Sequence, residues 1–246
     1  MRKFLTSFAL VGALALTIGV GVAFASHIGY HLFGDATIVP GGNPGNAVKL
    51  TSDIHSGPGY GGIDFKVAAG MTFADLNALA TDYKFEADDT CLGGSPRFQV
   101  NVTDPVSGDS GNIFVYIGPP PAYTGCPSNV WLITGNLLSG VNPIDTSQLN
   151  LGFFYDPYAT ALVKYGSYTV TGIQLVADAG WAFPDGEQTV FVDNTNIDGT
   201  IYTYDEKGHP QSTDDCKNGG WTDLVNDDGE AFKNQGDCVS YVNNGK

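Results

Sequence analysis

Short runs of alternating or β-branched residues recur along this chain, each closed by Gly, Pro, Asn or Asp. Alternation with a period of two is typical of strands that bury one face, and the closing residues favour tight turns. With 33 Gly, 13 Pro and only 15% charged residues in 246, the pattern predicts an all-β fold. We expect a jelly-roll-like β-sandwich with one or two short helices. The expected strands cover residues 47–51, 62–67, 97–102, 112–117, 130–133, 167–177, 188–194 and 200–204.

The two expected helices interrupt the strands. Thr72 is a good helix cap, and Phe73, Leu76 and Leu79 would then share one face of a helix. The pair Asp156-Pro157 opens a second helix, which would end before Gly166.

Residues 1–25 have the features of a secretory signal peptide. Arg2 and Lys3 precede an apolar run, which ends with small residues at Ala23 and Ala25. An uncleaved membrane anchor is the alternative, but several glycines interrupt the run. We expect cleavage, a secreted protein with cell-envelope association as an option, and no stable membrane insertion afterwards.

The remaining chain is strongly acidic. It holds 26 Asp and Glu against nine Lys and Arg, which excludes the basic patch that nucleic-acid binding requires. Only four of the acids are Glu (Glu86, Glu187, Glu206 and Glu230). Asp favours turns and also supplies oxygen ligands for calcium, so this bias fits either a turn-rich β protein or one that uses calcium as a cofactor to neutralise its loops.

Composition changes after residue 205. We expect a sandwich domain over 26–205 and a polar C-terminal tail over 206–246. Cys91 and Cys126 lie in the first part, and Cys216 and Cys238 lie in the second. An even number of cysteines in an exported chain favours disulfides, and proximity favours 91 with 126 and 216 with 238 among three pairings. A zinc site is the alternative, but no C-x-x-C spacing occurs.

No complete catalytic motif is present. Gly-Asp-Ser-Gly at 108–111 resembles the nucleophile motif of chymotrypsin-like proteases, but only 55 residues separate Ser110 from His55, the last preceding histidine. We interpret residues 104–112 as a hairpin loop. A glycosidase needs two facing carboxylates, and the adjacent pairs at 88–89 and 214–215 fit exposed turns better. We expect no enzymatic activity.

One loop has calcium-like spacing. Asn194, Asn196 and Asp198 precede Gly199, and Asp205 falls where the last ligand of an EF-hand-like loop would be. The alternative is a hairpin whose two-residue turn is Asp198-Gly199.

Two segments resemble known sequences. Gln-Thr-Val-Phe-Val-Asp-Asn-Thr-Asn-Ile at 188–197 resembles a late strand of jelly-roll carbohydrate-binding modules. Asp-Cys-Lys-Asn-Gly-Gly-Trp at 215–221, with Phe-Lys-Asn-Gln-Gly-Asp-Cys-Val-Ser-Tyr-Val at 232–242, is similar to a C-terminal tail of uncharacterised secreted bacterial proteins. The resemblance implies a bacterial exported protein and supports pairing of Cys216 with Cys238. It implies no substrate.

Aromatic side chains are the candidates for a glycan contact, because sugars stack their apolar faces on such rings. Trp181 lies in a Gly- and Pro-bounded segment and is expected to be more exposed than Trp131. Tyr123, with Tyr116 and Tyr155, either joins such a surface or closes the sandwich. Our first hypothesis is a noncatalytic glycan- or surface-binding protein whose partner is an extracellular glycan or envelope component. A structural or matrix protein of the envelope and an extracellular hydrolase are the alternatives.

Overall fold

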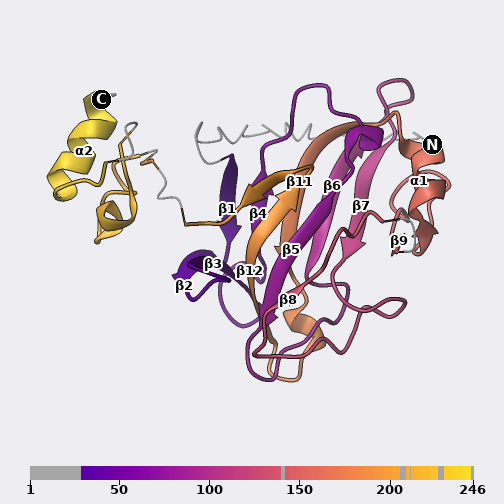
Figure 1. Cartoon of the computed structure of the whole chain (residues 1–246), viewed down its shortest axis with the longest axis horizontal. Helices are drawn as coiled ribbons and strands as arrows, with labels where there is room; N and C mark the ends of the chain where they lie inside the picture. Colours follow the sequence, from indigo (N-terminus) through magenta and orange to yellow (C-terminus); the bar gives the residue numbers. More distant parts are fainter. Residues whose placement is uncertain (1–28, 140–141, 206–208, 211, 227–229, 245–246) are drawn as a thin grey trace, which may run out of the picture.

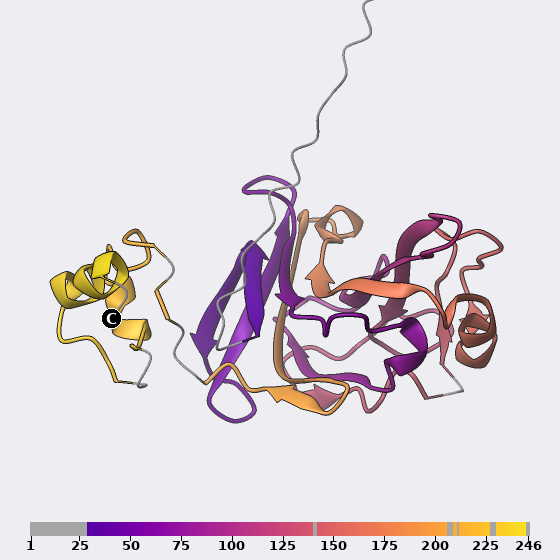
Figure 2. The ribbon, with the colours of Figure 1, turned by 90° about the horizontal axis from the view of Figure 1, so that it is seen from above.

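The computed structural model describes residues 29–139, 142–205, 209–210, 212–226 and 230–244. The expected signal peptide, residues 1–25, lies outside the described residues. Within them the protein is a sandwich of two antiparallel sheets, as Figures 1 and 2 show from two directions. The fold class predicted from the alternating runs, an all-β jelly-roll-like sandwich, is confirmed.

The first sheet has five strands. Their order, β1-β4-β11-β6-β7, places strands that are distant in sequence side by side (Figure 1). The strands are β1 (Tyr30–Gly34), β4 (Gly61–Phe65), β11 (Thr169–Ala177), β6 (Arg97–Thr103) and β7 (Ser110–Tyr116).

The second sheet faces the first across the core. Its main order is β2-β3-β12-β5-β8, and β13 pairs with β12. The strands are β2 (Ala36–Pro40), β3 (Asn46–Asp53), β12 (Glu187–Ile197), β5 (Leu79–Phe85), β8 (Leu132–Ile133) and β13 (Thr200–Tyr202). A separate pair, β9 (Pro143–Ile144) and β10 (Asp156–Pro157), lies beyond β7.

The core lies between the two sheets because each strand turns alternate side chains inward. In the first sheet, strand register aligns Leu32, Ile63, Leu175, Phe98 and Val115 across all five strands. All but the partly buried Leu32 are at most 2% exposed. The residues next to them in sequence consequently point away from the core.

The helices are short. The predicted second helix is confirmed as α1 (Tyr158–Tyr165), which packs against β9 and β10 at the end of the sandwich. The predicted helix from Thr72 is wrong beyond one turn. Only the 3₁₀ turn η1 (Phe73–Asp75) forms, because Leu79 already starts β5 and pairs with Ile197 of β12. The remaining elements are η2 (Gly180–Ala182), η3 (Gly220–Asp223) and α2 (Gln235–Asn244).

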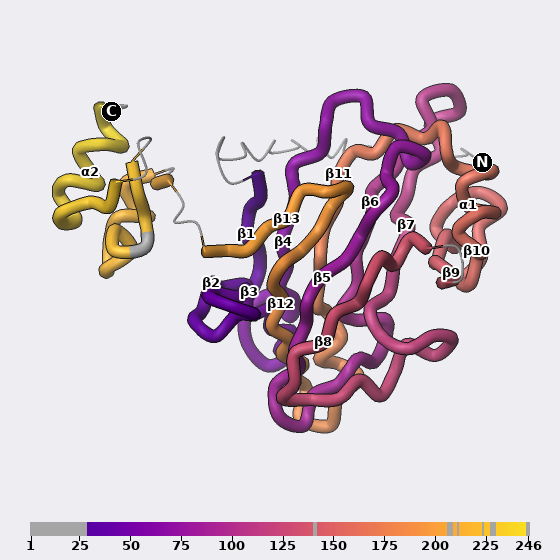
Figure 3. Tube along the Cα trace, in the orientation of Figure 1, coloured from indigo at the N-terminus to yellow at the C-terminus, as the bar shows by residue number. Residues whose placement is uncertain are grey.

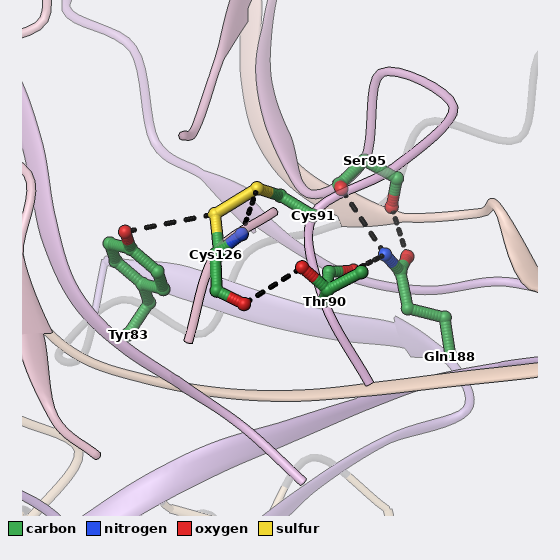
Figure 4. The surroundings of a disulfide bond; sticks show 6 residues. All are labelled: Tyr83, Thr90, Cys91, Ser95, Cys126 and Gln188. Carbon is green, nitrogen blue, oxygen red and sulfur yellow. Dashed lines mark hydrogen bonds between the residues drawn. A yellow bond between two sulfur atoms is a disulfide. The ribbon is translucent and has the colours of Figure 1, made fainter. Parts of the chain in front are cut away.

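Both predicted disulfides are present. Cys91 pairs with Cys126, and Cys216 pairs with Cys238. Figure 4 shows the first bond, where Thr90 donates a hydrogen bond to the Cys126 carbonyl at 2.8 Å. Gln188 of β12 donates to the Thr90 carbonyl at 2.9 Å, so this bond and its loops are tied to the second sheet.

The second disulfide belongs to a small apolar cluster of its own. Cys216, Phe232 and Cys238 are buried together, with Trp221, Leu224, Val239, Tyr241 and Val242 packed around them. The domain boundary at 205/206 adjoins residues outside the described part, so the division into two domains stays a prediction. None of the helices in the described part of the chain has the length and hydropathy of a membrane span.

Candidate functional site

The outer surface of the five-stranded sheet carries an ordered set of polar and aromatic side chains. Strand register pairs His31 with Asp64, Asp64 with Gln174, Gln174 with Gln99, and Gln99 with Phe114. We call these five residues the central row. Four strand spacings of about 4.8 Å make the row about 19 Å long. None of the five is fully buried, so the row faces away from the core.

Hydrogen-bonding groups make up the middle of the central row. The amide of Gln99 donates to that of Gln174 at 3.1 Å. Asp64 is half-buried beside them, and this burial raises the pKa of its carboxyl, with His31 and the Gln174 side chain partly offsetting the effect. Amide and carboxylate groups together offer the donors and acceptors that sugar hydroxyls need.

A second line of residues, the flanking row, runs beside the first. It comprises Phe33, Gly62, Val176, Arg97 and Tyr116. A Cβ on Gly62 would lie 2.2 Å from the tip of the Phe33 ring, so only glycine lets this ring lie across β4. The flanking row thus places aromatic rings at both edges of the sheet.

Arg97 lies in the flanking row with its charge neutralised. Its two terminal nitrogens donate to the two carboxylate oxygens of Asp178, each at 2.6 Å. The guanidinium also lies 4.8 Å from the centre of the Phe114 ring. Ser95 fixes Asp178, because its hydroxyl accepts a hydrogen bond from the Asp178 backbone N–H at 3.1 Å. The buried Nε of Arg97 has no acceptor among the described residues.

A third line, the amide row, completes this surface. Gly172 pairs with Asn101, and Asn101 pairs with Asn112. The Asn101 side chain lies over β11, where a Cβ on Gly172 would come within 2.9 Å of its amide nitrogen. Its buried Oδ1 has no hydrogen-bond donor in the described part of the chain. We call the three rows together the outer sheet face.

Trp181, the first predicted ligand residue, is exposed. It lies in η2, three residues after Asp178, and 65% of its surface is accessible. Its ring approaches Gly93, where a Cβ would lie 3.2 Å from Cζ2. Trp181 therefore lies in the loop that also supplies the partner of Arg97.

Trp131 lies elsewhere. It is partly buried immediately before β8, and Lys84 of the second sheet lies 5.1 Å from its ring centre. Lys84 also lies 4.8 Å from the Phe191 ring. Trp131 thus belongs with the second sheet and does not contribute to the outer sheet face.

Tyr123, the third predicted ligand residue, is only 4% exposed. Its hydroxyl donates to the Pro143 carbonyl at 2.7 Å, and the rings of Tyr116 and Tyr155 pack against it. The structure therefore does not favour direct contact between this buried ring and a ligand. Tyr155, by contrast, is 54% exposed.

The four predicted calcium ligands are spread around a hairpin. Ile197 pairs with Thr200, and Asp198 and Gly199 both have positive φ, which gives the two-residue turn that was the alternative. Asn196 accepts from the Gly199 backbone N–H, Asp198 from that of Asn77, and Asp205 from that of Asn46. Asn194 donates from its amide to the Asn43 carbonyl. Asn194 and Asp205 thus hydrogen-bond to the loop at 43–46, whereas Asp198 hydrogen-bonds to Asn77 and Asn196 to the turn itself.

Two other carboxylates do meet. Asp82 of β5 pairs in register with Asp193 of β12, and the loop at Asn43 covers both. The backbone N–H of Asn43 donates to Asp193 at 2.6 Å, and the Asn194 amide donates to Asp82 at 2.8 Å. Burial raises the pKa of Asp193. Within the described residues, no group of three or more His, Cys, Asp or Glu is arranged to hold a metal. Calcium binding stays a prediction.

The Gly-Asp-Ser-Gly segment lies in a hairpin, as expected, but the loop is shorter than the predicted 104–112, because residues 110–112 already belong to β7. Thr103 pairs with Ser110, the first residue of β7, and Asp104 accepts hydrogen bonds from Val106 and Ser107 within the loop. The side chain of Asp109 instead accepts from the Tyr168 hydroxyl at 3.0 Å.

Comparison with known proteins adds a limited likeness. No family model matches the chain, and no curated protein matches it. A solved structure described as an exo-beta-agarase is similar to it, with 18% identity and a TM-score of 0.34. The match covers 69% of this chain and 23% of the agarase chain, so the chain spans under a quarter of that protein.

Sequence reasoning missed most of the outer sheet face. Asp64, Gln99, Asn101 and Gln174 were not singled out, because each resembles an ordinary exposed strand residue. One signal was available, since Phe114 and Tyr116 occupy outward positions of an alternating strand whose inward positions are Ile113 and Val115. Outward aromatic residues on a strand are a reason to expect a binding surface.

Proposed function

We propose that the protein is a secreted, noncatalytic glycan-binding protein that holds a polysaccharide on the outer sheet face. The observation that carries this proposal is the central row, in which one carboxylate and two amides lie side by side on adjacent strands. Aromatic rings flank them, with Phe33 at one edge and Phe114 and Tyr116 at the other. Rings for the apolar faces of sugars, with amides for their hydroxyls, are the usual components of such sites.

The charges on this surface favour a neutral polysaccharide. An anionic chain would need unpaired cations, whereas Arg97 is neutralised by Asp178 and Asp64 adds a negative charge. The formal charge of the whole chain is −15. Repulsion at this surface disfavours sulfated or uronate-rich polymers.

Export supports this role without carrying it. Two disulfides are typical of proteins that fold in oxidising compartments. The expected signal peptide at 1–25 and the resemblance to carbohydrate-binding modules point in the same direction.

The test is binding of the purified, oxidised protein to a panel of polysaccharides, with calcium and with a chelator. Cellulose, xylan, mannan, β-1,3-glucan and chitin are the neutral probes, and alginate and hyaluronate are the anionic ones. We expect saturable binding to at least one neutral polymer and none to the anionic ones. A Gln99→Ala/Gln174→Ala variant should abolish it.

Phe114→Ala and Phe191→Ala form a matched pair for this test. Both are partly buried outward phenylalanines, but Phe191 lies on the second sheet. Loss of binding in the first and retention in the second would place the ligand on the outer sheet face. Absence of binding to every polymer would overturn the proposal and favour the envelope-structural alternative.

A further inference from the structure

The first sheet continues beyond its edge strand β7. Phe114 of β7 and Asp145 exchange two backbone hydrogen bonds, at 2.8 and 2.9 Å. The adjacent Ile144 of β9 pairs with Asp156 of β10, so the direction of the central row continues from Phe114 to this segment. Figure 3 shows β7, β9 and β10 following one another at this side of the sandwich. Tyr155 immediately precedes β10.

A series of aromatic rings follows the same direction. Phe114 and Tyr116 are stacked, with centroids 6.4 Å apart. Tyr116 contacts Tyr123 at 5.3 Å, and Tyr123 stacks on Tyr155 at 6.4 Å with planes inclined by 16°. The series therefore begins on the outer sheet face and ends at an exposed ring.

Tyr155 has the two properties that a sugar-stacking ring requires. One face is supported by Tyr123, whose hydroxyl is fixed on Pro143, and the side chain is 54% exposed. The next ring inward is also fixed, since Tyr116 donates to Asp145 at 2.5 Å. A ring that is already held in place loses little conformational entropy when a ligand stacks on it.

The loop that carries Tyr155 is itself anchored. The buried carboxylate of Asp156 accepts hydrogen bonds from Lys164 at 2.7 Å and from Thr146 at 2.9 Å. The Thr146 N–H donates to the Phe153 carbonyl at 2.9 Å, and the Phe153 N–H donates to the Thr146 side-chain hydroxyl oxygen at 3.0 Å. Tyr155 lies between these two anchors, so its position does not depend on a ligand.

We propose that Tyr155 forms an outlying sugar-binding subsite, separate from the outer sheet face, for the distal units of a neutral polysaccharide that crosses the strands. This inference rests on the proposed function. Because the central row alone is about 19 Å long, only a chain of several sugars reaches both regions. Tyr123 then supports the subsite from behind, and Tyr155 makes the contact.

The test is a series of oligosaccharides of two to eight sugars from cellulose, mannan, xylan and β-1,3-glucan, titrated into the purified protein by calorimetry. For wild type we expect affinity to rise as the chain becomes long enough to reach Tyr155. In Tyr155→Ala this increase of affinity with chain length should be lost, so that the longest oligosaccharide binds about three- to tenfold more weakly than to wild type. The shortest oligosaccharide that wild type binds should bind the variant with unchanged affinity. Tyr155→Phe keeps the ring and should behave as wild type.

Phe154→Ala is the matched control, because Phe154 is the adjacent exposed aromatic residue, at 64% exposure. Nitration of Tyr155 by tetranitromethane should be slowed by the longest oligosaccharide and not by the shortest. Unchanged affinity of Tyr155→Ala for every length, while Gln99→Ala/Gln174→Ala abolishes binding, would overturn the subsite and leave the proposed function standing. Absence of binding by wild type to the whole series and to the polymers would overturn both.

Discussion

Arg97 and Asp178 form a bidentate ion pair at one end of the outer sheet face, with both hydrogen bonds at 2.6 Å. The Arg97 side chain is only 13% exposed and lies against the Phe114 ring. A cation in this position helps to fix an aromatic ring while Asp178 cancels its charge. The pair therefore contributes both to the stability of the sheet and to the neutrality of the surface.

Removal of one partner tests this relationship. Asp178→Asn leaves the guanidinium without a counter-charge, so we expect the free energy of unfolding to fall by about 2 kcal/mol. This loss is smaller than that for a fully buried ion pair, because Asp178 is partly exposed. Urea unfolding measures it. Arg97→Met and the double variant complete a double-mutant cycle, and the double variant should lose less than the sum of the single losses. Strict additivity would show that the pair contributes no coupling.

Asp89 predicts a pH dependence of stability. Burial raises the pKa of its carboxyl to about 6. A hydrogen bond from the Thr189 backbone N–H lowers this pKa in part, and the nearby acids Asp185, Glu187 and Glu86 raise it further. The folded state thus binds this proton more tightly than the unfolded state, whose pKa is about 3.9. Stability from this group is greatest below pH 4 and falls as the pH rises from about 4 to 6. After allowance for solvent screening at this half-exposed site, we expect a loss of about 1 kcal/mol.

Asp89→Asn should remove that slope, because its Oδ1 still accepts from Thr189 but no longer titrates. Thermal unfolding of wild type and variant across pH 4 to 7 measures the difference. Asp88→Asn makes the same change in net charge in the same loop and serves as the control. A slope between pH 4 and 6 that is identical in wild type and Asp89→Asn would contradict the prediction.

The Cys216–Cys238 bond joins cysteines 22 positions apart, and the described part of this segment buries three side chains in its cluster, those of Cys216, Phe232 and Cys238. A loop of this size contributes about 3 kcal/mol in the chain-entropy account, which is large for so small a cluster. Cys216→Ser/Cys238→Ser should therefore unfold the C-terminal unit, and trypsin should cleave rapidly at the exposed Lys217 and Lys233. We expect the thermal midpoint of the sandwich to stay unchanged.

Cys91→Ser/Cys126→Ser is the counterpart, and it should lower the midpoint of the sandwich because both cysteines belong to its core. A similar fall of that midpoint in the Cys216→Ser/Cys238→Ser variant would show that the tail is part of the sandwich fold. This experiment also tests the predicted boundary at residue 205.

The fold was predictable because a strand with one buried face alternates apolar and polar residues, and this period of two can be read from the sequence. Alternation along β6 and β7 and the Asp198-Gly199 turn identify strands and a hairpin without tertiary information. The expected helix at Thr72 failed because the spacing of Phe73, Leu76 and Leu79 suits two structures. Leu79 pairs with Ile197, 118 positions later in the chain, and this pairing stabilises the strand over the helix. Local propensity gives no information about a contact between such distant residues.

The outer sheet face was not predictable for a related reason. Asp64, Gln99 and Gln174 are neighbours only because β11 lies between β4 and β6. A single sequence does not give strand order or register, and each residue alone fits a solvated strand face. The exposure of Trp181 was predictable, because its Gly- and Pro-bounded segment has the composition of a loop. The stacking of Tyr155 on Tyr123 was not, because it depends on β9 and β10, which are only two residues long each.

Gly62 and Phe33 provide the last prediction. A methyl group at Gly62 would approach the Phe33 ring to 2.2 Å, so Gly62→Ala should push the ring off the sheet. Because β1 is an edge strand and the ring is only partly buried, Phe33 can rotate, and we expect stability to fall by about 1 kcal/mol. Polysaccharide binding should weaken to the level of Phe33→Ala. Urea unfolding and binding to the polymer panel measure the two effects.

In the Phe33→Ala background the added methyl group meets no ring, so Gly62→Ala should then cost little further stability. An equal cost of Gly62→Ala in both backgrounds would show that the methyl group clashes with the strands themselves and that Phe33 does not depend on the glycine.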